Sequence, residues 1–121
     1  MNNLITYLDL HKSMSFQDLL FQFIDNSKQK DSEIYKKAEI DRKLFSKIRC
    51  SKTYIPRKNI VLKLCIALQL NEEDTERLLK SAGYSLSSTS FDLIISYCIE
   101  NEIYDSSIIN DYLYTHCNAV L

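Results

Sequence analysis

Lysine and arginine residues are concentrated in one segment of this 121-residue chain. Residues 28–58 carry eleven Lys and Arg against four Asp and Glu, and the remaining residues carry four basic and twelve acidic ones, so the net charge is only −1. A concentrated positive charge can bind phosphate groups, but the same composition also occurs on an ordinary solvated helix face. Where the basic residues fall on the predicted helices, and which faces of those helices they share, distinguishes these two interpretations.

Catalytic chemistry has little support in the sequence. A single glycine, Gly83, cannot build a glycine-rich phosphate loop. The two histidines, His11 and His116, stand near opposite ends without a partner pattern, and the consecutive acids Glu72 and Glu73 suit the start of a helix. We therefore expect no enzymatic activity, no catalytic residue and no cofactor.

The cysteines and the apolar segments bear on metal binding and location. The four cysteines, at positions 50, 65, 98 and 117, include no CxxC pair, so we expect free thiols and no metal site. Residues 1–15 lack the basic start and long apolar run of a signal peptide, and no segment reaches the roughly 18 consecutive apolar residues of a membrane span. We expect a cytoplasmic protein without a membrane partner.

The composition predicts an all-α fold. Apolar residues make up 45% of the chain, which argues against disorder, and glycine and proline occur once each. A β fold of this size would need many more turn residues. The length suits one domain with a single core.

Helical periodicity and capping residues divide the chain into six or seven helices. Ser15, Asp41 and Asn71 are good N-caps, and Gly83 is placed to end a helix. Residues 1–14 are expected to form an N-terminal arm or short helix. The helices after it are expected at about 15–24, 31–38, 42–49, 57–68, 71–82, 91–101 and 107–116, with a loop at 50–56.

The helix expected at 42–49 separates an apolar face from a basic one. Phe45 and Ile48, three residues apart, face inward. The side chains left outside can contact bases or the groove of a duplex: Arg42, Lys43, Leu44, Ser46 and Lys47. Around them, we expect phosphate contacts from Arg49, Lys52, Arg57, Lys58 and Asn59.

This layout resembles the helix-turn-helix of the Cro/lambda-repressor family, also called the xenobiotic-response-element type. The resemblance covers about residues 15–82, with SEIYKKAEIDRKLFSKIR in the place of the two-helix motif. Ile40 matches the buried aliphatic residue before the recognition helix, Asp41 its N-cap and Pro56 the loop proline. The resemblance implies a five-helix domain at 15–83 that places helix 41–49 in the major groove of double-stranded DNA, and hence a small transcriptional regulator.

Residues 36–99 also resemble a module of Gram-positive bacteria that is sometimes attached to effector or enzyme domains. This second resemblance implies an alternative function, a protein-interaction adaptor or inhibitor in a phage-defence or mobile-element context. The module would then keep the fold without sequence-specific DNA readout. The fold alone does not separate the two functions.

Residues 90–121 are expected to extend the five-helix domain by two helices. Their apolar side chains outnumber the inner positions that two helices offer, which favours a symmetric homodimer built by this extension. Repressor-type domains read paired half-sites, which also favours a dimer. The interface residues expected are Ile95, Ile99, Ile103, Ile109, Tyr112 and Leu113.

Overall fold

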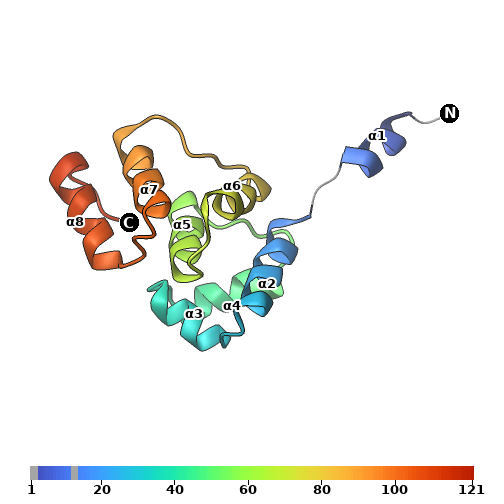
Figure 1. Ribbon diagram of the computed structural model, residues 1–121. Helices are drawn as coiled ribbons and strands as arrows, with labels where there is room; N and C mark the ends of the chain where they lie inside the picture. The colour runs from blue at the N-terminus through green and yellow to red at the C-terminus, as the bar shows by residue number, and fades with distance from the viewer. Residues whose placement is uncertain (1–2, 12–13) are drawn as a thin grey trace.

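The computed structural model describes residues 3–11 and 14–121, and all its regular structure there is helical (Figure 1). The all-α prediction is confirmed. Residues 1–2 and 12–13 of the expected N-terminal arm lie outside the described residues. The helices are α1 (Asn3–His11), α2 (Phe16–Ser27), α3 (Asp31–Lys37), α4 (Arg42–Cys50), α5 (Lys58–Ala67), α6 (Glu72–Ser81), α7 (Ser90–Glu100) and α8 (Ser106–Cys117).

Helix α5 lies at the centre of the core (Figure 1). It packs against α3 on one side and α6 on another. Because it is apolar around most of its circumference, it needs cover from several helices. Its buried side chains are Val61, Leu62, Leu64, Cys65, Ile66 and Ala67.

The predicted N-caps are confirmed. The Ser15 hydroxyl accepts a hydrogen bond from the Asp18 amide at 3.1 Å, and the Asn71 side chain accepts one from the Asp74 amide at 2.9 Å. The Asp41 carboxylate accepts the Lys43 amide at 3.3 Å at the start of α4. These bonds satisfy amides that have no partner inside the first helical turn.

Four helices end in the same way, although the chain has one glycine. After α3, α5, α6 and α7 the backbone enters the left-handed region, at Glu39 (φ 56°), Gln69 (φ 53°), Gly83 (φ 86°) and Glu102 (φ 56°); α2 and α8 also end at left-handed residues, Lys28 and Asn118, with other hydrogen bonds. The amide of the following residue then bonds back to the last full turn, as the Ile40 amide does to the Tyr35 carbonyl at 2.9 Å. The role of Gly83 is as predicted, whereas the other three ends use residues that pay a steric cost for this conformation.

Helices α7 and α8 pack against each other, and α7 also packs against α6. This mutual packing gives the extension more inner positions than two independent helices would have. Four predicted dimer residues, Ile95, Ile99, Ile109 and Leu113, are consequently buried in the core of a single chain. Their predicted contact with a second subunit is wrong, since they offer no surface to it. The other two, Ile103 and Tyr112, are partly buried against the same core.

Helix α1 extends away from the remaining helices (Figure 1). It buries none of its residues. In the part of the chain that the structure describes, no helix has the length and apolarity needed to cross a membrane.

Candidate nucleic-acid interface

Helix α4 presents a basic face next to a buried one. Phe45 and Ile48 are buried, and Phe45 also packs its ring against that of Tyr35 on α3. This anchoring leaves one side of α4 in solvent. The exposed side chains on it are Arg42, Lys43, Ser46 and Lys47.

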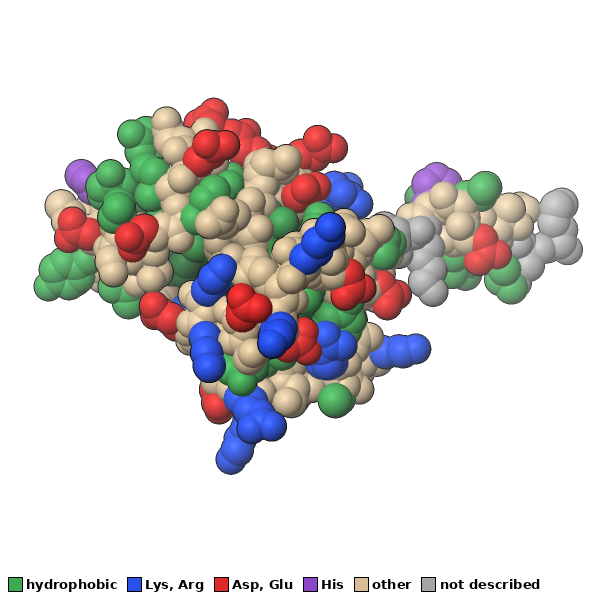
Figure 2. Space-filling model, turned by 60° about the horizontal axis from the view of Figure 1, so that its bottom comes forward, with side chains coloured by type: hydrophobic (Ala, Val, Ile, Leu, Met, Phe, Trp, Pro, Cys, Tyr) green, Lys and Arg blue, Asp and Glu red, His purple; other side chains and the backbone are tan. Residues whose placement is uncertain are grey.

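Basic side chains gather on the surface formed by this part of the fold. Figure 2 shows Lys and Arg mainly towards the lower part of the molecule, with some acidic side chains among them, and acidic side chains together with a few basic ones in the upper part. The separation matches the charge distribution along the chain. Such a surface raises the local concentration of a polyanion.

The C-terminal end of α4 is held by Gln17 of α2, a residue not singled out from the sequence. The Gln17 side-chain amide donates to the Arg49 carbonyl at 2.6 Å and to the Ile48 carbonyl at 3.3 Å. Gln17 is only 7% exposed. Its signal in the sequence is a polar residue directly after the buried Phe16, at the start of an otherwise apolar helix face. Gln17 therefore fixes where the basic face points.

Arg49, a predicted phosphate contact, has partners within the chain. Its guanidinium forms two short contacts with the Asp31 carboxylate, at 2.7 and 2.8 Å, and lies 4.4 Å from the centre of the Phe21 ring. These contacts join α4 to α3 and α2. Because Asp31 neutralises part of the charge of Arg49, this residue is better described as one that positions α4 than as a free phosphate ligand.

Lys47 is also positioned by a neighbour. Its ammonium lies 4.3 Å from the centre of the Tyr54 ring, in the loop after α4. The ring offers its negative face to the ammonium without neutralising it. Lys47 therefore keeps its charge and a defined direction.

The loop and the start of α5 add further exposed groups. Lys52, Arg57 and Asn59 are exposed, as the sequence analysis requires of phosphate contacts. Arg57 is the N-cap residue of α5, and its side chain caps no amide. Among residues 3–11 and 14–121, the side chains of Lys52 and Arg57, like those of Arg42 and Lys43, form no ion pair.

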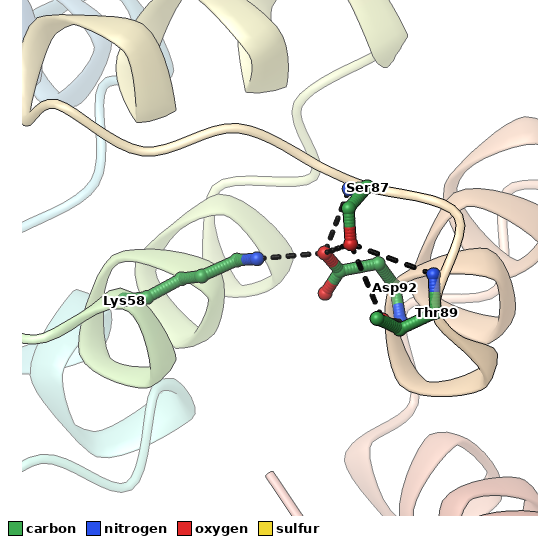
Figure 3. A network of polar contacts seen from close by, with 4 residues as sticks. All are labelled: Lys58, Ser87, Thr89 and Asp92. Carbon is green, nitrogen blue, oxygen red and sulfur yellow. Dashed lines mark hydrogen bonds and ion pairs between the residues drawn. The ribbon is translucent and has the colours of Figure 1, made fainter.

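Lys58 points elsewhere, contrary to its predicted role as a phosphate contact. Its ammonium lies 2.7 Å from the carboxylate of Asp92 on α7, and the two groups point toward each other (Figure 3). The same carboxylate oxygen accepts the Ser87 amide at 2.7 Å and the Ser87 hydroxyl at 2.8 Å. The charge of Lys58 is thereby used to join α5 to α7.

The environment of Asp92 keeps its carboxylate charged. Burial, with 3% exposure, favours the neutral acid. The hydrogen bonds from Lys58 and Ser87 and the charge of Lys58 outweigh this burial, so the pKa of Asp92 lies below its ordinary value. This ion pair connects the surface next to α4 with the C-terminal helices.

Leu44 is half-buried and packs against the core. The sequence predicts Leu44 among the exposed side chains that contact bases or the groove. Its burial shows that at least part of the side chain stabilises the fold.

The scan of family models and the searches of curated proteins and of solved structures each returned no match to this chain. The functional inference therefore depends on the arrangement of α2 to α5 and on the residues that these helices expose.

Proposed function

We propose that this chain is a small DNA-binding protein, a transcriptional regulator in which α3 and α4 act as a helix-turn-helix. In this proposal α4 enters the major groove, and α2, α3, α5 and α6 complete a five-helix domain that α7 and α8 extend. The observation that carries the proposal is the exposed basic face of α4, oriented by the buried Phe45 and Ile48 and by the Gln17 contact.

The residues predicted to contact DNA fall into groups according to where they lie and whether they also form ion pairs within the chain. Arg42, Lys43, Ser46 and Lys47 are exposed on α4 and would face base edges or the groove walls. Lys52, Arg57 and Asn59 would contact phosphates on either side. Arg49 and Lys58 support this surface indirectly through their ion pairs with Asp31 and Asp92.

Binding to random duplex DNA over a series of salt concentrations tests the proposal. The Lys43→Glu/Lys47→Glu variant should bind more weakly. The slope of log K against log salt should become shallower by up to about 2, because the variant lacks two positive charges that displace counterions from the duplex. A variant that stays folded by circular dichroism yet keeps the wild-type affinity and slope contradicts the proposed interface.

The matched control is Arg77→Glu/Lys80→Glu on α6. It changes the net charge equally, and it removes an exposed ion pair within α6 and the contact of the Arg77 guanidinium with the Phe23 ring, 5.8 Å from the ring centre. We expect this control to lower affinity less and to keep most of the salt dependence, because its charges lie outside the proposed interface.

A protein-interaction function is the second candidate. It is favoured by exposed apolar side chains on α7 and α8, among them Leu93, Tyr97 and Tyr114. An adaptor or inhibitor would use such a surface without DNA readout. Absence of DNA binding at low salt by the folded wild-type protein selects this candidate over the first.

A further inference from the structure

Two apolar surfaces of this chain are uncovered. One is α1, where Tyr7 and Leu8 lie three and four residues after Leu4. The three side chains are 51–64% exposed. The Tyr7 ring stacks on His11 with 4.1 Å between ring centres, so the stripe continues to the end of the helix. Residues at this spacing share one face of a helix, and such a face can dock into a groove; Ile5 and Leu10, which are also exposed, lie to either side of it.

The second surface is a groove between α7 and α8, with a volume of about 380 Å³. Leu93 and Tyr97 on its α7 side are 54% and 53% exposed. The rings of Tyr97 and Tyr112 meet edge to face with centres 6.5 Å apart, so side chains of α7 and α8 are in contact at that point of the groove. The lining residues are Leu93, Ile94, Tyr97, Tyr112 and His116.

Helix α1 needs contact with another surface to remain helical in water. It has nine residues, and isolated helices shorter than about 12–15 residues are only marginally formed in water. Burial of its apolar stripe is the contribution that would stabilise it.

The groove of the same chain is a poor partner for α1. From His11 to Phe16 the chain advances five residues, which span at most about 18 Å when extended. This short link joins α1 to α2, which packs on α6. Helix α1 and the α8 side of the groove lie at opposite ends of the molecule (Figure 1). The hollow next to Met14 is nearer, but its volume of about 170 Å³ is less than half that of the α7–α8 groove, and its lining combines the apolar Met14 and Leu19 with Ser81 and the charged Arg77 and Lys80.

We propose that α1 of one copy docks into the α7–α8 groove of a second copy, and that two copies exchange α1 reciprocally. Leu4, Tyr7 and Leu8 then contact Leu93, Tyr97 and Tyr112. Reciprocal exchange uses the same pair of surfaces twice and closes about a two-fold axis, so assembly stops at the dimer. The proposal goes beyond DNA binding and is tested without DNA.

Analytical ultracentrifugation of the full chain at several micromolar concentrations measures the association. We expect a dimer for the wild type. Leu8→Glu on α1 and Leu93→Glu in the groove should each weaken it roughly thirtyfold or more, as removal of an interface hot spot does. The matched controls Leu10→Glu on α1 and Ile108→Glu on α8 change exposed apolar residues outside the stripe and the groove. They should change the affinity by about threefold or less.

Mixing the two weakened variants identifies the occupant of the groove. The Leu93→Glu chain has an intact α1 and the Leu8→Glu chain has an intact groove, so their heterodimer keeps one complete contact. The equimolar mixture should therefore associate more strongly than either variant alone.

Three results of these association measurements would overturn the proposal. They are a wild type that stays monomeric, a dimer that Leu8→Glu leaves unchanged, and a mixture that associates no better than its components. If Leu8→Glu instead lowers the unfolding midpoint of a monomer, α1 packs on its own chain, which also overturns it.

Discussion

At the scale of single residues, Gln17 links two helices through a side chain that the core almost completely covers. We predict that Gln17→Met destabilises the protein by roughly 1–3 kcal/mol, because the change leaves two carbonyl groups without their donor. Urea unfolding measures this loss. Gln22→Met makes the same chemical change at an exposed position of α2 and should be nearly neutral. Equal effects of the two substitutions would argue against a role for the Gln17 bonds.

The Asp92 ion pair makes stability depend on pH in a defined direction. The pKa of Asp92 is lowered from 3.8 in the folded chain. The resulting stabilisation is therefore complete above the unfolded-state pKa, near pH 4, and is lost as the pH falls through the folded-state pKa. Asp92→Asn should cost roughly 2 kcal/mol at neutral pH, the cost of losing hydrogen bonds to a charged group.

This deficit should shrink as the pH falls below about 4 and through the lower folded-state pKa, where the wild-type carboxylate also becomes protonated. Urea unfolding at a series of pH values from neutral to acid gives both quantities. Asp111→Asn, on the exposed side of α8, is the control and should show little deficit at any pH. A deficit for Asp92→Asn that stays constant into acid would show that the charge of Asp92 does not stabilise the fold.

At the scale of elements, the left-handed helix ends are a place where the chain can gain stability. We predict that Gln69→Gly, after α5, stabilises the protein by about 0.5 kcal/mol. The change relieves roughly 1–2 kcal/mol of steric cost at φ 53° and loses roughly 0.5–1 kcal/mol to the greater freedom of glycine in the unfolded chain. Thermal and urea unfolding measure the gain.

The control for Gln69→Gly is the same substitution inside a helix. Gln22→Gly, at an exposed position of α2, should destabilise by about 1 kcal/mol, because glycine there has no steric cost to relieve. If both substitutions destabilise equally, the left-handed conformation at Gln69 carries no strain.

Capping residues and helical periodicity predicted most of the helices, and contacts between residues far apart in the sequence explain what they missed. Ser15, Asp41 and Asn71 could be recognised as caps because the bond that each makes lies within three residues. The ends at Glu39 and Glu102 could not be recognised by a glycine, because glutamate adopts the left-handed conformation there. The burial of Ile95 and its neighbours depends on how α7 and α8 pack together, which periodicity does not specify.

The candidate site could be predicted where it depends on residues close together in the sequence. The spacing of Phe45 and Ile48 correctly placed these two side chains in the core and left a basic face in solvent. The charges alone could not show that Lys58 is paired with Asp92, 34 residues away along the chain, or that Arg49 is paired with Asp31. The binding of DNA by this face stays a prediction.

At the scale of the whole molecule, the four cysteines report on opening of the core. Cys65 and Cys98 are buried, Cys50 is exposed and Cys117 is partly exposed. Burial raises the pKa of Cys65 to about 12 and also raises the pKa of Cys98, so neither forms the reactive thiolate at neutral pH. We predict two fast and two slow thiols towards Ellman's reagent in the native protein.

Denaturant gives the matched control for the thiol measurement, because all four cysteines should react at similar rates in the unfolded chain. The two slow rates in the native protein should follow the free energy of opening as urea is raised towards the transition. Four equal rates in native conditions would show that the core around α5 is open to solvent.

The position of α5 also matters while the protein is being made. A chain is synthesised from its N-terminus at about 5–20 residues per second. Helix α3 is complete before α5 begins, but α6, which covers another side of α5, ends at Ser81. For roughly one to three seconds the nascent chain therefore carries an apolar helix with part of its final cover missing. A nascent chain held with residues up to Leu70 outside the ribosome should be the form of this protein that molecular chaperones bind most readily.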